Sequence, residues 1–239
     1  MADLSLVDSI VEELRALSSP SIKKVLVNHG ATEPFFGVKI GDMKPIVKRL
    51  GIDYELSLAL YSTGISDAMY LGGLIADDAK MTRSDLEKWL DEARWSMLYE
   101  STVPWVAAGS PIGLELALEW IESADERVSS AGWRTLSTIA SITSDDKLDL
   151  PLYTALLQRV AASIHTAPNR TRSCMSGFIS AVGVFVAPLT HEAISTAQKV
   201  GVVMVNNGNT ACKAPSAESD IAAAAAKGVI GKKRKTAKC

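Results

Sequence analysis

The sequence predicts an all-α protein, an α-solenoid of antiparallel helix pairs, and three observations support this. Apolar residues recur at helical spacing along nearly the whole chain, and strand-like alternation is scarce. The connections between periodic segments are two to six residues long. Because short connections place consecutive helices side by side in opposite directions, we expect stacked helix pairs.

Local signals set the expected bounds of each helix. Asp3 and Asp42 are candidate N-caps, Gly30 suits a left-handed helix end, and Thr82 with Asp85 resembles a capping box. The stretch 33–38 is expected to form a loop. The predicted helices cover residues 3–17, 20–29, 42–50, 53–61, 66–79, 82–93, 95–108, 111–122, 125–142, 151–165, 169–186 and 190–200.

The helical spacing of apolar residues is interrupted beyond residue 200. Residues 202–215 contain a turn signal at 206–209 and predict a short extended excursion, after which Ser216 caps an Ala-rich helix that ends at Lys227-Gly228. We therefore predict a HEAT-like helical repeat domain over residues 1–200, a C-terminal extension packed on it over 201–228, and a basic tail over 229–239. No strict repeat is visible, but HEAT-like repeats of about 40–47 residues diverge readily.

Composition is that of an ordinary globular chain, with 47% hydrophobic and 22% charged residues. No apolar run reaches the roughly 18 residues of a membrane helix, and the first residues are acidic, unlike a signal peptide. We expect a cytoplasmic protein. Cys174, Cys212 and Cys239 lack CxxC or metal-ligand spacing, so free thiols, no metal site and no cofactor are expected.

Charge is distributed unevenly. Of 25 basic residues, five lie in 231–239, so the rest of the chain has 20 basic against 27 acidic residues, a balance of −7. DNA affinity would therefore have to come from local patches or from the tail. Within the tail, Lys232, Lys233, Arg234 and Lys235 form either a nonspecific nucleic-acid arm or a disordered, solubilising end.

Two stretches resemble the DNA alkylation repair family of HEAT-like-repeat proteins. The first is Asn28-His29 followed by the loop 35–40, which contains Phe-Phe-Gly-Val-Lys-Ile, and the helix from Met43 to Leu50. The second is Trp95 to Ala107, WSMLYESTVPWVA. The resemblance covers about residues 20–190, and it implies the same fold and double-stranded DNA, damaged or distorted, as the partner.

The resemblance also assigns roles to single positions. Glycosylase members carry Trp-x-x-x-Asp on the central helix, where the aspartate stabilises charge as an alkylated base departs. Anchored on Pro104, the aspartate position falls on Glu100 and the tryptophan position on Ser96, one residue after Trp95. A glutamate keeps the charge, but its extra methylene moves the oxygens by about 1 Å, which can cost about a hundredfold in rate.

Two further family positions differ here. An Arg-Arg-x-Ala pattern that contacts phosphate matches Val128-Ser129-Ser130-Ala131, so both arginines are absent and Arg127 is the nearby substitute. A Gly-Trp pair that lines the lesion cleft matches Gly177-Phe178, which keeps an aromatic ring.

The residues themselves suggest three candidate sites. Trp95 and Tyr99 share a helical face beside Glu100 and are expected to line a cleft for a base. The alternatives are core packing for these rings and for Trp105, and a solvated, inert Glu100. Two basic groups are candidate phosphate contacts. One comprises Lys39, Lys44, Lys48 and Arg49 around one short helix, with a solvated face as the alternative. The other, the better anion-site candidate, comprises Arg170 and Arg172 at a helix N-terminus.

Three functional hypotheses remain open. The first is a DNA-binding protein of the alkylation repair type, with Glu100 stabilising charge during cleavage of an N-glycosidic bond. The second is a non-catalytic relative that binds distorted DNA. The third is a helical-repeat scaffold that holds a protein partner in its concave groove.

Overall fold

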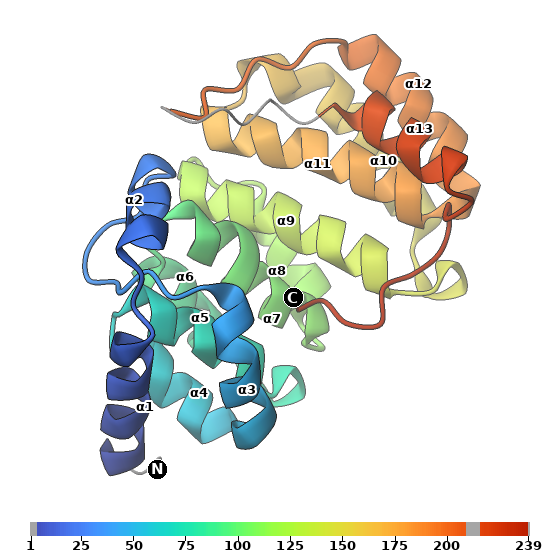
Figure 1. Cartoon of the computed structure of the whole chain (residues 1–239). Coiled ribbons are helices and arrows are strands. Elements are labelled where there is room, and N and C mark those ends of the chain that lie inside the picture. Colours follow the sequence, from blue (N-terminus) through green and yellow to red (C-terminus); the bar gives the residue numbers. More distant parts are fainter. Residues whose placement is uncertain (1–3, 209–215, 239) are drawn as a thin grey trace. The chain divides into compact units, whose positions relative to one another are not determined.

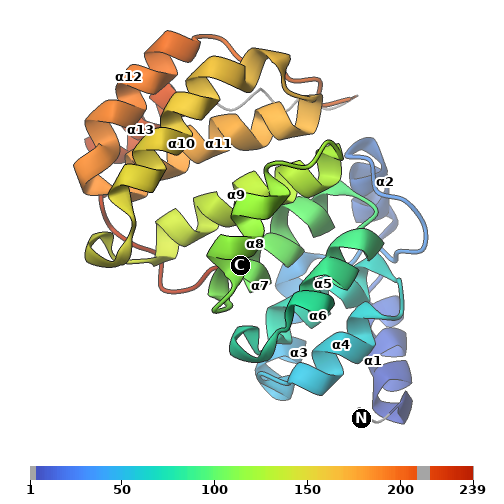
Figure 2. The same cartoon turned by 180° about the vertical axis from the view of Figure 1, so that it is seen from behind.

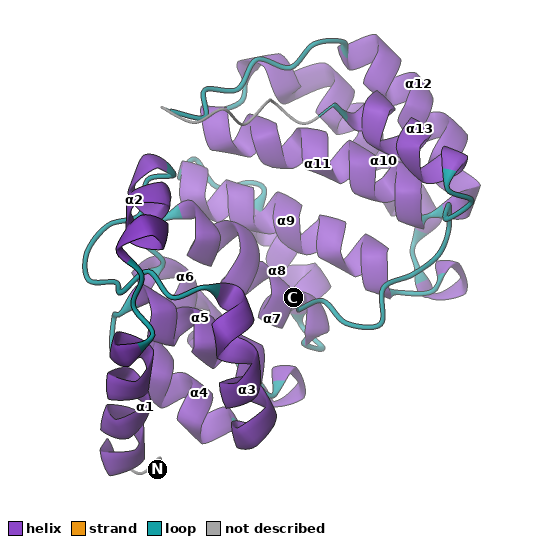
Figure 3. Cartoon of the chain, viewed as in Figure 1, coloured by secondary structure: helices purple, strands orange, loops and turns teal. Residues whose placement is uncertain are grey.

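The computed structural model describes residues 4–208 and 216–238. All regular elements in these two ranges are helical, and neither range contains a β-strand (Figure 3). This confirms the all-α prediction. The chain divides into two compact units between Ile112 and Gly113. Unit 1 comprises the described residues up to Ile112 with Gly208 and Lys238, and unit 2 comprises residues 113–207 and 216–237.

The elements are labelled in Figure 1. Unit 1 contains α1 (Leu4–Ala16), α2 (Pro20–Asn28), α3 (Ile40–Leu50), α4 (Tyr54–Tyr61), α5 (Ser66–Ile75), η1 (Asp78–Lys80), α6 (Arg83–Glu92), η2 (Leu98–Thr102) and α7 (Val103–Gly109). Unit 2 contains α8 (Gly113–Trp120), α9 (Glu126–Ile142), η3 (Asp145–Lys147), α10 (Leu150–Ser163), η4 (Ile164–Thr166), α11 (Asn169–Phe185), η5 (Ala187–Leu189), α12 (Thr190–Val200) and α13 (Ala217–Ala226).

The described helix starts follow the expected capping chemistry except at α3, and the candidate N-cap Asp3 lies outside the described residues. The capping box is confirmed: Asp85 N donates to Thr82 Oγ1 at 3.2 Å, and Thr82 N donates to Asp85 Oδ2 at 2.9 Å. The prediction that Asp42 caps α3 is wrong. The helix begins at Ile40, because Asp42 N already donates to Lys39 O at 2.9 Å, and Asp42 lies in the first turn. In that position its negative charge still interacts favourably with the helix dipole.

The central helix predicted over 95–108 is continuous in the structure over residues 96–109, but its winding changes within this range. Residues Leu98–Thr102 form a π-helical turn, and α7 then starts at Val103. Pro104 contributes to this change in winding, because proline has no N–H to donate to the carbonyl of Glu100, the acceptor four residues earlier. The π-turn therefore lies on the segment that carries the predicted catalytic position.

Unit 1 is held together by close contacts of α5 with its neighbours. A Cβ on Gly72 would lie 2.8 Å from Ser57 O, so glycine lets α5 approach α4 closely. A Cβ on Gly73 would clash with the side chain of Thr102, which places η2 directly against α5. Figures 1 and 2 show α4 and α5 as neighbours from both sides. The geometry of η2 is thus fixed by the core.

Unit 2 is organised around the long helices α9 and α11. Ser129 and Thr171 join them through an Oγ to Oγ1 hydrogen bond of 2.8 Å. A Cβ on Gly183 would clash with Ile221, so α13 packs closely on α11. Figures 1 and 2 show α10, α11, α12 and α13 gathered together in both views. Their apolar side chains form one continuous core with those of α8 and α9.

The C-terminal part matches the expected elements where it is described. Residues 201–208 form no regular element, and α13 follows with Ser216 as its N-cap. Part of the predicted turn at 206–209, together with Cys212 and Cys239, lies outside the described residues. Cys174 is buried. The predicted boundary after residue 200 coincides with the end of α12, whereas the one after residue 228 lies two residues beyond the end of α13 at Ala226; as domain boundaries both stay predictions.

No single helix among the described residues is long and apolar enough to cross a membrane. One pair, residues 169–185 with 187–200, meets these criteria only when taken together, and it is bent by 114°.

Candidate functional site

Glu100 lies inside unit 1, not on its surface. Glu100 is part of the π-turn η2, and the residue is 7% exposed. Three other residues of this turn are also buried: Leu98, Tyr99 and Thr102. The alternative reading of Glu100 as a solvated, exposed carboxylate is therefore wrong. A carboxylate at this depth has little access to a DNA sugar in this conformation.

The two aromatic rings next to Glu100 are also buried. Trp95 is 4% exposed, and its Nε1 donates to Ser66 Oγ at 3.2 Å; Tyr99 is 8% exposed. Trp105 packs edge-on against Tyr70 with 5.5 Å between ring centroids. Core packing, the alternative, describes these rings better than an open base-stacking cleft, because their faces are covered by unit 1.

A carboxylate that the sequence did not single out organises the aromatic loop of residues 33–38. Asp67, at the start of α5, is 3% exposed. Its Oδ2 accepts hydrogen bonds from Phe36 N (2.6 Å) and Gly37 N (3.4 Å), and its Oδ1 accepts one from Val38 N (2.8 Å). Three adjacent backbone donors therefore converge on one internal anion.

The same loop leads directly into a basic surface on α3. Lys39, Lys44 and Lys48 are exposed, and none of them forms an ion pair with a described residue. Arg49 differs, since its Nη1 donates to Glu13 Oε1 at 3.2 Å. Lys44 and Lys48 are four residues apart and share a face, while Met43 and Ile46 face the core. We call Lys39, Lys44 and Lys48 the α3 lysine strip.

The position without the family's arginines is structural in this chain. Ser129 is buried, and its hydroxyl shares a hydrogen bond with that of Thr171 between α9 and α11. Arg127, the nearby substitute, donates from Nη2 to Asp125 Oδ2 at 3.1 Å, and Asp125 is the N-cap of α9. Its guanidinium therefore already contacts a carboxylate of its own helix terminus.

The helix N-terminus near Arg170 already holds an anion from the protein itself. The backbone N of Arg170 donates to Glu126 Oε1 at 2.6 Å. Its Nη1 donates to Asn207 Oδ1 at 3.4 Å. The prediction of an open phosphate site at this terminus is wrong, because a glutamate carboxylate accepts the hydrogen bond that a phosphate would take.

Arg172 supports the segment 201–208. Its Nη1 donates to Met204 O at 2.9 Å, and its Nη2 donates to Ala167 O at 3.0 Å. Asn169 also fixes this segment, since its side-chain Nδ2 donates to Asn206 O and its Oδ1 accepts from Asn206 N. Arg172 is therefore a structural residue in this conformation.

Phe178 has no exposed surface. Its ring packs edge-on against Trp133 at 5.2 Å and is stacked with Tyr153 at 5.8 Å between centroids. The prediction that it lines a lesion cleft is wrong for this conformation, because three rings from α9, α10 and α11 form the centre of the unit 2 core.

The basic tail is ordered through residue 238. Gly231 N donates to Val184 O and Arg234 N donates to Ser141 O, both at 2.8 Å. Lys232, Arg234 and Lys235 are exposed, whereas Lys233 is 17% exposed and contacts Asp145. The reading of this segment as a disordered end is therefore wrong.

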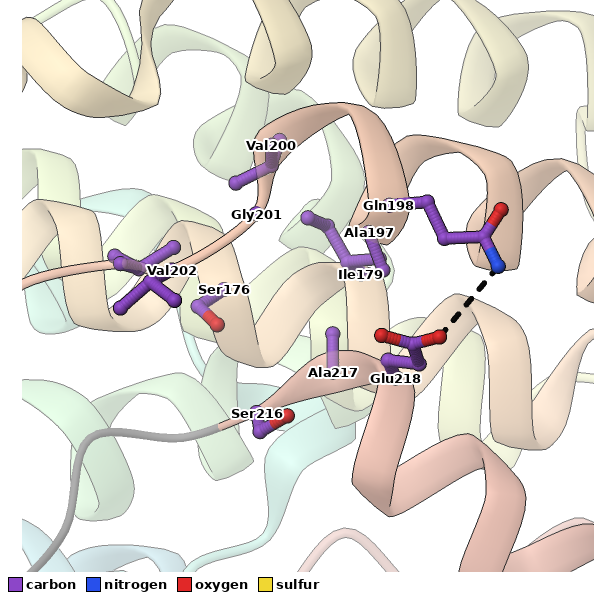
Figure 4. Close-up of a pocket in the computed structure, with 11 residues that line it drawn as sticks. Ser176, Ile179, Ala197, Gln198, Val200, Gly201, Val202, Ser216, Ala217 and Glu218 are labelled. Atoms are coloured by element: carbon purple, nitrogen blue, oxygen red, sulfur yellow. Dashed lines mark hydrogen bonds between the residues drawn. The ribbon is translucent and has the colours of Figure 1, made fainter.

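A pocket of about 360 Å³ lies between α11, α12 and α13 in unit 2. Figure 4 shows Ile179 and Ala197 on its apolar side and a hydrogen bond of 3.5 Å from Gln198 Nε2 to Glu218 Oε1. No basic residue lines it among those the structure describes. The pocket therefore offers no counter-charge to phosphate.

Comparisons with known proteins agree with this architecture. A family model described as "DNA alkylation repair enzyme" matches residues 10–201. Two uncharacterized proteins, from Listeria monocytogenes and Listeria innocua, are 38% and 37% identical over 220 residues, which is 90% of this chain and 95% of each relative.

A solved structure is similar over nearly its whole length. It is described as "A new family of proteins related to the HEAT-like repeat DNA glycosylases with affinity for branched DNA structures". The TM-score is 0.91 at 36% identity, and the match covers 98% of this chain and 99% of that chain. The predicted HEAT-like α-solenoid class is confirmed.

Proposed function

This chain belongs to the family of DNA alkylation repair enzymes, and from that premise we propose that it binds branched or distorted double-stranded DNA without excising a base. The burial of Glu100 supports the second part of this proposal most directly. Charge stabilisation during base loss needs a carboxylate within about 3 Å of the sugar, and Glu100 is 7% exposed inside η2.

The neighbours of Glu100 support the same conclusion. The Trp95 ring is buried and donates a hydrogen bond to Ser66. Because Gly73 has no Cβ, Thr102 of η2 packs directly against α5. Exposing Glu100 would require η2 to leave a packed core, so a catalytic conformation is costly.

DNA affinity has a separate physical basis in the α3 lysine strip. Its three ammonium groups are exposed and form no ion pair with described residues, so phosphate contact breaks no existing salt bridge. The structural relative described as having affinity for branched DNA favours junctions as the ligand. A cytoplasmic location agrees with a DNA ligand and is part of this proposal.

The strip is tested by titrating the protein into labelled four-way junctions and linear duplexes at 50–200 mM salt. We expect tighter binding to the junction, with affinity that falls steeply as salt rises. Replacing Lys39, Lys44 and Lys48 with Gln should reduce the salt slope by roughly 0.9 for each phosphate that the variant no longer neutralises.

A matched control for the strip is the pair Lys80→Gln and Lys88→Gln. These lysines are 66% and 54% exposed, but they already pair with Asp77 and Glu92. The control should bind like the unchanged protein. Weak binding that does not respond to salt, in the unchanged protein, would eliminate the DNA-binding proposal.

The absence of excision is tested with methylated duplex DNA. We expect no release of 3-methyladenine or 7-methylguanine above the protein-free background, since Glu100 is buried. Release by the unchanged protein that disappears in Glu100→Gln would contradict the non-catalytic proposal and restore the glycosylase hypothesis.

A further inference from the structure

The C-terminal segment Gly231–Lys238, called the strap below, is anchored through its backbone. Gly231 N donates to Val184 O near the end of α11, and Arg234 N donates to Ser141 O near the end of α9. Ala237 is 4% exposed. These contacts hold the main chain of residues 231–237 against unit 2.

Two of its lysines point inward and use the same arrangement. Lys233 Nζ donates to Ala140 O at 2.8 Å and pairs with Asp145 Oδ1 at 2.7 Å. In unit 1, Lys238 Nζ donates to Ala76 O at 2.6 Å and pairs with Asp78 Oδ1 at 2.7 Å. Each ammonium thus lies at the C-terminal end of a helix, where the carbonyl dipoles favour a cation.

These inward lysines pair with acids that are partly covered by the protein, with side chains 21% (Asp78) and 27% (Asp145) exposed. Asp78 Oδ1 and Asp145 Oδ1 are inaccessible to solvent and have no hydrogen-bond partner in the described chain apart from these ion pairs. Burial raises the pKa of Asp78, and the Lys238 ammonium opposes that rise. Removing either lysine would leave a carboxylate oxygen that is inaccessible to solvent without its counter-charge.

The remaining basic side chains point the other way. Lys232, Arg234 and Lys235 are exposed, and Lys232 and Lys235 form no ion pair with a described residue. The strap itself contains no acid. Because its backbone is already ordered, phosphate binding would not cost the entropy of fixing a flexible tail.

We propose that the strap is a preformed phosphate-binding element in which Lys232 and Lys235 contact the DNA backbone, while Lys233 and the backbone hydrogen bonds of Gly231 and Arg234 hold the segment on unit 2. This rests on the proposed function as a DNA-binding protein. It assigns opposite roles to neighbouring lysines: Lys233 is internal and structural, whereas Lys232 and Lys235 act at the surface.

The test is the double variant Lys232→Gln and Lys235→Gln, titrated into the four-way junction across the same salt range. We expect weaker binding and a salt slope smaller by roughly 0.9 for each of the two phosphates that are no longer neutralised. The melting temperature should be unchanged, because neither side chain forms a hydrogen bond or an ion pair with a described residue. The control is Lys199→Gln with Lys227→Gln, exposed lysines of unit 2 outside the strap.

The control changes the net charge equally, so it should retain the unchanged slope. If the slope falls as much in the control as in the strap variant, only overall charge matters and the inference is overturned. It is also overturned if the strap variant binds with the slope of the unchanged protein. In both cases the unchanged protein still binds, which separates these results from failure of the proposed function.

Lys233→Met supplies an independent readout. We expect a lower melting temperature and also weaker junction binding, since the strap loses the anchor that Lys233 provides although this side chain is only 17% exposed. A variant that melts earlier yet binds DNA with an unchanged salt slope would show that strap order is irrelevant to binding, and would overturn the preformed element.

Discussion

Replacing Phe178 with Ala is expected to destabilise unit 2 by about 3–5 kcal/mol, the usual cost of deleting a buried aromatic ring. The ring is fully buried and contacts Trp133 and Tyr153, so its removal leaves a cavity where three helices meet. Urea and thermal unfolding of the variant measure this destabilisation. We expect a large fall in the unfolding midpoint.

The control lies on the same helix. Phe185 is only partly buried at the end of α11, so Phe185→Ala should cost less than Phe178→Ala. The alternative from sequence, a ring that lines a DNA cleft, makes the opposite prediction. A Phe178→Ala variant that keeps its unfolding midpoint but binds junctions more weakly would contradict the core role.

Phe178 illustrates why the fold was more predictable than the site. Helical periodicity is a local property, and the apolar spacing along α9 and α11 reports burial directly. An aromatic residue satisfies that spacing equally well in a core or in a cleft. The sequence therefore located the helix of Phe178 correctly but could not decide which surface its ring meets.

The same distinction separates the charged candidates that the structure contradicts from those that it leaves exposed. Arg170 is 44 residues from Glu126, whose carboxylate accepts its N–H, and the local sequence does not reveal such a partner. The exposure of Lys44 and Lys48, by contrast, follows from the amphipathic pattern of α3, with Met43 and Ile46 opposite. Patterns within one helix were predictable, whereas partners from distant helices were not.

The π-turn at Glu100 shows that sequence periodicity cannot predict every change of winding, even within one helix. The periodic residues from Trp95 onward predicted one uninterrupted helix over 95–108. The insertion of a π-turn depends on packing against α5, where Gly73 leaves room for Thr102. A one-residue change in winding moves Glu100 relative to Pro104, so alignment on Pro104 alone cannot fix its orientation.

Asp67 is the residue that sequence reasoning missed and whose replacement we expect to matter most in unit 1. Its three hydrogen-bond donors lie 29–31 residues earlier in the chain, so no local motif identifies it. The only signal is an acidic residue in the first turn of a helix, which many helices have.

The variant Asp67→Ala is expected to destabilise unit 1 by about 3 kcal/mol, because hydrogen bonds to a charged acceptor are strong and their donors are left buried. Asp67→Asn should be less destabilised, since an amide keeps one acceptor oxygen. The control is Asp42→Ala, an exposed acid in the first turn of α3, which should unfold almost like the unchanged protein. Thermal unfolding compares the three variants.

Amide hydrogen exchange gives the local readout for Asp67. The N–H groups of Phe36 and Val38 should exchange much faster in Asp67→Ala, because the acceptor that protects them is gone. Lys39 follows Val38 directly, so a loosened loop should also disturb the α3 lysine strip and weaken junction binding. If exchange at Phe36 and Val38 is unchanged, Asp67 does not hold the loop, and the link from this buried carboxylate to the DNA-binding surface fails.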